Sequence, residues 1–471
     1  MEKTASVRLL QLLGWEGDAL TAFLPDWERA VPLLNLTEED IAFAADVWIP
    51  KYWDISLKSV QKMIALFFEE AAELAKTEEY LRAGHKVIST HNTSSFVCLY
   101  ANKIAGSDRL HIIYPDFIIS TMWQAFFGKS PETDFGEDET VVRCSHCALN
   151  CTRAREMTKG KIPEPTVNWS WGLFCDEAPK TVELIECMSS KNEVETVLVT
   201  APHDSALGQV EADSEERVEY LAKKLRSCQE RITSRTGINV TEDDMTAAWD
   251  AYMSYMERVE EITNLVIYAD PQPVSGNELA LFSVCMQVCF NLGVEAVNEA
   301  LDIAIEEIRE RILLKKGPLP KGAPKLACYF VPLNVPWVDR MFRENGVNLS
   351  LGRLYPLASM MEEKLKSEMD PYLAAARQIY MSHDAVNMEN AAGIAENLLS
   401  RFPLDGALIG FYDFDRWIGS LQKTEMRLVE ERTGIPHFYL EGDFWAINKV
   451  SAEDRKAVIR GICNCLKISS V

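Results

Sequence analysis

The first eighty residues carry apolar side chains at helical spacing and show no alternating strand pattern. The apolar stripe is longest over residues 57–81, where it recurs every three or four positions. Thr37, with Asp40 three residues later, has the pattern of a helix N-terminus. We therefore expect residues 1–82 to form an N-terminal helical region.

From residue 85 the pattern changes to short runs rich in β-branched and aromatic residues, separated by longer helical or loop segments. These runs cover residues 85–90, 110–114, 166–171 and 196–200. Alternation of this kind is typical of a βα-wound lobe with a parallel sheet. We expect residues 83–270 to form this first α/β lobe, including helices over 214–234 and 241–265 that begin at Asp213 and Thr241.

A break rich in proline and glycine follows, and the strand pattern then starts again. Helices are predicted over 277–292 and 294–314, and a linker over 315–325, so that residues 271–325 form a helical connector. Further strands are predicted over 326–331, 348–354, 405–411 and 435–440, with a last helix from Ser451. The sequence thus predicts an α/β fold with two βα-wound lobes of the Rossmann or flavodoxin type, the second over 326–471.

Composition and charge narrow the possible functions. The longest apolar runs, such as 63–68 and 284–292, are much shorter than the ~20 residues that span a bilayer. Residues 1–13 lack the pattern of an export signal, so we expect a cytoplasmic protein without a membrane segment. The net charge of −23 disfavours binding to nucleic acid.

The twelve cysteines are the main chemical signal. Without an export signal we expect reduced thiols, not a disulfide framework. Four cysteines fall within 32 positions, in loop-like surroundings, and thiolates suit iron–sulfur clusters or zinc. They are Cys144, Cys147, Cys151 and Cys175. A zinc-stabilised binding protein therefore remains open at this point. Five others lie in apolar contexts typical of buried structural cysteines: Cys187, Cys228, Cys285, Cys289 and Cys328.

The residues around these cysteines resemble a known family. Cys147 is followed by Gly-Lys-Ile-Pro-Glu-Pro over 160–165, then by Cys175-Asp176 at the end of a predicted strand, and then by Glu183. Two further segments, 197–203 and 434–443, match in the same order. Over roughly residues 80 to 465 the chain resembles the 2-hydroxyacyl-CoA dehydratase and benzoyl-CoA reductase superfamily, and in particular its larger, alpha-type subunit.

The resemblance implies an iron–sulfur enzyme that processes an acyl-CoA thioester in an anaerobic cell. It implies a 4Fe-4S cluster, a second homologous subunit in a heterodimer, and a separate ATP-dependent iron–sulfur activator that supplies electrons. In this family one electron reaches the thioester carbonyl and forms a ketyl radical anion. A leaving group is then expelled in the dehydratases, or an aromatic ring is reduced in the reductases, and the sequence does not distinguish the two reactions.

The resemblance also implies cluster ligands, with one departure. Cys147 and Cys175 are the expected ligands, with Cys144 and Cys151 as further candidates. The family's third cluster cysteine corresponds to Asp415 here, and a carboxylate is a harder ligand than a thiolate. Loss of the cluster, in a scaffold subunit, and reduction of a small substrate without CoA are therefore alternatives.

Polar residues follow the first predicted strand. His91, Ser94 and Ser95 lie there, and groups of this kind bind phosphate or carbonyl oxygen at a helix N-terminus. Two interpretations are open: a plain helix N-cap, and binding of the substrate by these residues.

Overall fold

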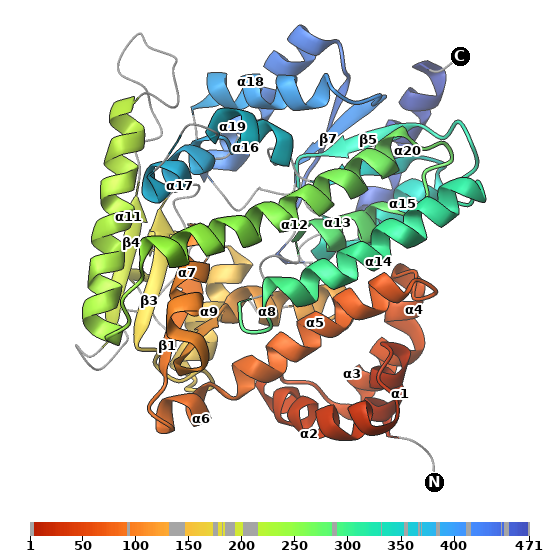
Figure 1. The fold of residues 1–471 in the computed structure, drawn as a ribbon. Coiled ribbons are helices and arrows are strands. Elements are labelled where there is room, and N and C mark those ends of the chain that lie inside the picture. Colours follow the sequence, from red (N-terminus) through yellow and green to blue (C-terminus); the bar gives the residue numbers. More distant parts are fainter. Residues whose placement is uncertain are drawn as a thin grey trace, which may run out of the picture.

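The computed structural model contains two parallel sheets surrounded by helices (Figure 1). It describes residues 4–91, 95–130, 147–172, 178–180, 182–183, 194–200, 215–284, 290–330, 332–352, 357–365, 368, 370–382, 387–410, 416–443, 445–446 and 452–469. None of the helices in these ranges is long and apolar enough to cross a membrane.

The N-terminal region is helical, as predicted, and its helices gather at one end of the molecule (Figure 1). They are α1 (Ala5–Leu12), α2 (Gly17–Leu33), α3 (Glu38–Phe43), the π-helix η1 (Ala44–Trp48), α4 (Ile49–Tyr52), α5 (Lys58–Ala75) and α6 (Thr77–Arg82). The start of α3 at Thr37 is confirmed, since Thr37 Oγ1 accepts from Asp40 N at 3.2 Å and Asp40 Oδ2 accepts from Thr37 N at 2.9 Å.

The first sheet has the strand order β2-β1-β3-β4, and all its pairs are parallel. Its strands are β1 (Lys86–His91), β2 (Leu110–Ile113), β3 (Val167–Gly172) and β4 (Glu195–Thr200). The helices between and after them are α7 (Phe96–Gly106), η2 (Ser107–Arg109), α8 (Pro115–Thr121), η3 (Met122–Phe126), α9 (Ala148–Thr158), α11 (Glu215–Thr236) and α12 (Glu242–Tyr268). All four predicted strands are confirmed to within one residue at their starts.

Two helices, α13 (Gly276–Val284) and α14 (Val294–Leu313), lead to the second sheet, which has the order β6-β5-β7-β8 and is also parallel. Its strands are β5 (Lys325–Cys328), β6 (Asn348–Gly352), β7 (Gly406–Gly410) and β8 (His437–Leu440). The helices around it are η5 (Pro332–Asn334), α15 (Pro336–Glu344), α16 (Ala358–Leu365), α17 (Pro371–Tyr380), α18 (Met388–Leu399), α19 (Arg416–Thr433) and α20 (Ala452–Ser469). The predicted α/β class with two βα-wound lobes is therefore confirmed.

The core of the second sheet follows the two-residue period of its strands. Leu326, Cys328 and Leu408 belong to a large cluster that also contains residues of the first sheet and of the N-terminal helices. Ala407 and Ile409 face a smaller cluster on the other side. The large cluster therefore joins the two halves of the molecule.

Two contacts show how the halves meet. The long helix α12 packs against α7 in the first half and against β6 in the second (Figure 1). Phe117, on α8 after β2, makes an edge-to-face contact with Trp445, after β8, at 6.1 Å between ring centroids. The segment after β2 of the first sheet therefore contacts the segment after β8 of the second sheet. The exact division into four regions at 82, 270 and 325 stays a prediction.

Candidate site at the start of helix α9

Cys147 lies directly before α9, and its backbone oxygen accepts from Cys151 N at 3.0 Å, which makes it the cap residue of the helix. Cys151 follows one turn later. The two residues are 5% and 7% exposed, so both thiols are buried beneath the surface. A helix N-terminus carries partial positive charge, and this favours the thiolate form that binds metals.

Helix α9 is anchored on both sides by polar contacts. Ser120 of α8 bonds Thr152 at 3.4 Å between their hydroxyl oxygens. On the other side, Arg153 Nη2 donates to Asn168 Oδ1 of β3 at 3.1 Å. Because α9 ends at Thr158 and β3 begins only nine residues later, the helix runs opposite to the strand. Its N-terminus and Cys147 therefore lie toward the carboxyl end of β3.

The guanidinium of Arg153 is enclosed by protein, and the residue is 1% exposed. Among the residues that the structure describes, none accepts a hydrogen bond from its Nε or Nη1. Burial lowers the pKa of Arg153 to about 9. An arginine is rarely buried completely unless an anion faces it, since an unpaired charge is costly to desolvate.

Two hydroxyls lie on the same side of the sheet as Asn168. Ser89 is in register with Asn168 on the neighbouring strand β1, and Ser170 is two residues further along β3. Both are 1% exposed or less, and in the described ranges neither Oγ has a hydrogen-bond partner. The face of β1 and β3 near α9 is therefore polar and rich in donors.

The substrate-binding prediction falls on the segment after β1. His91 is the last residue of β1 and pairs with Ser170, and its side chain, like all of Ser94, lies outside the described part of the chain. Ser95 is the N-cap of α7, where its Oγ accepts from Cys98 N at 3.3 Å, and it is 3% exposed. The helix cap is thus present, and the role in substrate binding stays a prediction.

The comparison with known families identifies the chain's relatives. Residues 160–455 match the family model described as 2-hydroxyglutaryl-CoA dehydratase, D-component, and this is more than half of the chain. The chain belongs to this dehydratase family. Its resemblance to the superfamily is thereby confirmed, while the subunit type stays a prediction. No curated protein matches the chain.

Three of the five predicted ligands of this dehydratase-family protein lie outside the described residues: Cys144, Cys175 and Asp415. Within the described ranges no three His, Cys, Asp or Glu side chains are grouped so that they could hold a metal. Cys147 and Cys151 are therefore the predicted ligands whose surroundings are known.

Other cysteines of the dehydratase-family chain serve as packing residues. Cys98, Cys228 and Cys328 are all buried, and burial raises the pKa of the Cys98 thiol to about 12 and that of Cys228 to about 11. A thiol that resists ionisation is a poor metal ligand. Cys465 on α20 is exposed.

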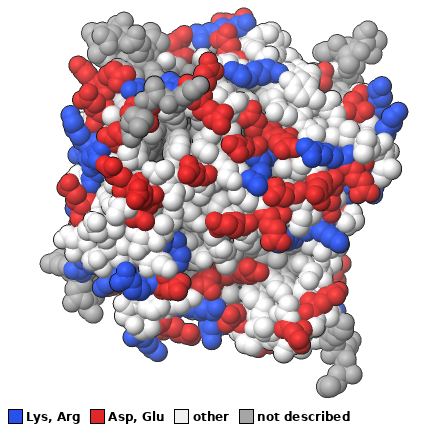
Figure 2. All heavy atoms as spheres, viewed as in Figure 1, with Lys and Arg blue, Asp and Glu red and all other residues white. Residues whose placement is uncertain are grey.

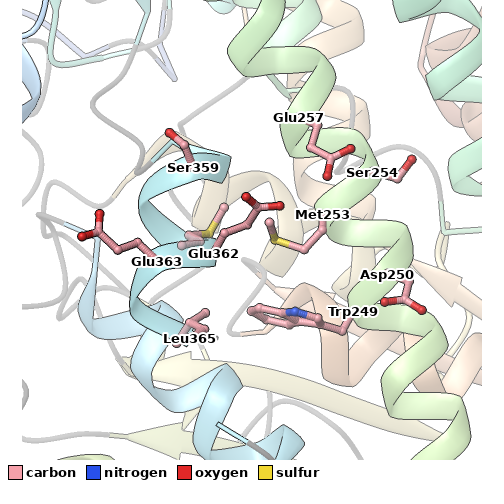
Figure 3. Close-up of a pocket in the computed structure, with 10 residues that line it drawn as sticks. Trp249, Asp250, Met253, Ser254, Glu257, Ser359, Glu362, Glu363 and Leu365 are labelled. Carbon is pink, nitrogen blue, oxygen red and sulfur yellow. The ribbon is translucent and has the colours of Figure 1, made fainter. Parts of the chain in front are cut away.

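A separate pocket opens between α12 and α16, with a volume of about 820 Å³. Figure 3 shows Trp249 and Met253 of α12 and Glu362 of α16 pointing into the space between these helices. Its lining also contains Asp250 and Glu257, and none of the lining residues that the structure describes is basic. Since carboxylates repel phosphates, this pocket is unsuited to the coenzyme A part of a dehydratase substrate.

No prediction from the sequence included Arg153, Asn168, Ser89 or Ser170. A signal was present, because residues 167–171 read Val-Asn-Trp-Ser-Trp, with polar residues at alternate positions of a strand in a two-sided parallel sheet. Such strands are normally apolar throughout, so alternation at this place marks a polar inner face.

Proposed function

We propose that this chain is the iron–sulfur subunit of an acyl-CoA-processing radical enzyme, similar to 2-hydroxyacyl-CoA dehydratases or benzoyl-CoA reductases. In this proposal Cys147 and Cys175 hold a 4Fe-4S cluster, with Cys144, Cys151 or Asp415 completing its ligand set. The observation that carries the proposal is the pair of buried thiols at the N-terminus of α9, in a chain of the dehydratase family.

The surroundings of this helix suit a cluster. Cys175 follows β3 by three residues, and β3 is the strand that Arg153 of α9 contacts. The buried guanidinium of Arg153 brings a positive charge to this region, and the hydroxyls of Ser89 and Ser170 make the neighbouring face of the sheet polar. A thiolate-bound cluster is anionic, and a positive charge near it fits such a group.

A bound cluster would supply single electrons to the thioester of the substrate. The protein's own task is to hold the thiolates, to exclude water and to orient the acyl group. Cys147 and Cys151 are already almost free of solvent contact. We assign the binding of substrate oxygen to the segment with His91, Ser94 and Ser95, because it follows β1, the strand beside β3.

The proposed partners follow from the same family membership. A second homologous subunit would form a heterodimer with this chain, and an ATP-dependent iron–sulfur activator would deliver the electrons. Such a system operates in an anaerobic cytoplasm.

The first experiment is metal analysis of the chain expressed anaerobically with iron and sulfide, alone and with its partner subunit. We expect about four irons and four sulfides per chain. Cys147→Ala and Cys175→Ala should lose most of the iron, whereas Cys465→Ala, a cysteine variant at an exposed position of α20, should keep it.

Three results would contradict the proposal. Zinc without sulfide would favour a zinc-stabilised binding protein. Iron retained in both ligand variants would place the cluster elsewhere. No metal in any preparation would indicate a scaffold subunit. If the cluster is present, assays with a 2-hydroxyacyl-CoA and with an aromatic acyl-CoA distinguish dehydration from reduction.

A further inference from the structure

The buried charge of Arg153 is not balanced by any described residue. Its only hydrogen bond in the described ranges goes to the neutral amide of Asn168. No ion pair of Arg153 occurs there either, although Glu156, one turn later on α9, pairs with the partly exposed Lys161 beyond the end of the helix, at 3.3 Å. A buried charge is stable in a protein only if a favourable interaction compensates the free energy of its desolvation.

A general property of helices indicates where the compensating group lies. Long helical side chains lean toward the N-terminus of their helix, and for α9 this is the end with Cys147. Six residues of helix correspond to about 9 Å of rise, and this sets the scale of the separation between Arg153 and Cys147. The atoms around the guanidinium leave no room for a water molecule, so its effect on a group at Cys147 acts through space.

We propose that Arg153 is a positioning residue whose fixed positive charge stabilises the thiolate-bound cluster at the start of α9 and makes that cluster easier to reduce. The inference rests on the proposed function. Reduction adds one electron to the cluster, which makes its charge more negative, so a nearby cation favours the reduced form. Through a medium with an effective dielectric constant of about 20, a unit charge roughly 10 Å away changes an equilibrium by about tenfold.

The test is a redox titration of the anaerobically reconstituted protein, followed by electron paramagnetic resonance. Arg153→Met should lower the ratio of reduced to oxidised cluster about tenfold at a fixed potential. Arg153→Lys, which keeps the charge, should restore most of that ratio. Arg155→Met changes a less buried arginine on the same helix and should leave the ratio within about twofold.

A second variant covers the case in which Arg153→Met does not fold. Asn168→Asp places a carboxylate at the position now 3.1 Å from the guanidinium and should lower the ratio in the same direction, although Arg153 is retained. Circular dichroism establishes that each variant is folded.

The outcomes separate the inference from the proposed function. An unchanged ratio in Arg153→Met and Asn168→Asp, with the cluster fully bound, would overturn the inference and leave the function standing. A loss in Arg153→Lys as large as in Arg153→Met would also overturn it, since packing and not charge would then matter. A wild-type chain without iron in any preparation would remove both.

Discussion

At the scale of single residues, the end of strand β7 lies in close contact with the neighbouring strand β8. Gly410 ends β7 with φ = 130°, and it pairs with Leu440 of β8. A Cβ at Gly410 would lie 2.0 Å from the backbone oxygen of Leu440, which is too short for any contact. Only glycine fits this position, directly before the segment that contains Asp415.

We therefore expect Gly410→Ala to destabilise the protein by roughly 2–4 kcal/mol, because both the backbone conformation and the contact become unfavourable. Unfolding in urea measures the change. Gly393→Ala is the matched control, since Gly393 lies within α18 with no atom within 4 Å of the added Cβ, and alanine favours helix there. Equal stability of Gly410→Ala and wild type would mean that β7 ends differently.

A buried carboxyl on α5 gives a second prediction at this scale. Glu70 accepts from Asn291 N and from Asn291 Nδ2, both at 2.9 Å, and burial raises the pKa of Glu70 to about 8 despite these bonds. The folded state thus holds this proton more tightly than the unfolded state. We expect the contribution of Glu70 to stability to be largest below pH about 4.5 and to fall as the pH rises to about 8.

The free energy of unfolding as a function of pH tests this expectation. Glu70→Gln cannot titrate and should flatten the profile between these values, whatever its effect on absolute stability. Glu306→Gln, at an exposed position of α14, serves as a control. Parallel profiles for Glu70→Gln and wild type would contradict the assignment.

At the scale of elements, the sequence predicted the helix starts that nearby capping residues determine. The capping boxes at Thr37 and Thr241 begin α3 and α12 as expected, and Gly293 lies just before α14. The predicted helix over 277–292 is described only as far as Val284, where α13 ends. Residues 285–289 lie outside the described part, and residues 290–292 form a turn, so the predicted end at residue 292 is wrong.

The cap of α12 gives a prediction at this scale. Thr241 Oγ1 accepts from Asp244 N at 3.2 Å, and Thr241→Ala should cost about 1 kcal/mol because that amide loses its acceptor. Thr246→Ala in the same helix removes only a bond to Glu242 O and should be nearly neutral. Thermal unfolding of the two variants compares them, and an equal loss in both would contradict the capping role.

Arg153 shows what the sequence could not predict. Its position on a helix is visible in the pattern, but its complete burial depends on how α9 lies against β3, and this is decided by residues far apart in the chain. The same holds for the contact of Phe117 with Trp445. The order of the cysteines could be read from the sequence, whereas the residues around each cysteine became known only from the folded structure.

At the scale of the whole molecule, ion pairs tie the N-terminal helices to the connector. Arg311 of α14 donates to Asp54 at 2.6 Å and to the backbone oxygen of Pro273 at 3.2 Å. Burial tends to raise the pKa of Asp54, but the bonds from Ser56 and Arg311 outweigh it and leave that pKa lowered. This arginine therefore joins three separate segments.

We expect Arg311→Met to destabilise the protein by about 1–3 kcal/mol, a value reduced because Asp54 is partly exposed and solvent weakens the pair. Arg309 also lies on α14 and forms an exposed ion pair with Glu261 of α12. Arg309→Met removes this pair and should cost less than about 1 kcal/mol. Urea unfolding distinguishes them, and similar losses would show that the buried position has no special role.

The acidic surface affects the rate at which charged ligands associate with this protein. Figure 2 shows Asp and Glu side chains across one face of the molecule, most densely over α12 and α14. The negative charge of this face repels a polyanion that diffuses toward it, so productive collisions occur mainly at other parts of the surface. Dissolved ions weaken the repulsion beyond about 8 Å at physiological ionic strength. The association rate of a polyanionic ligand with this protein should therefore increase with added salt, the reverse of what a basic binding surface produces.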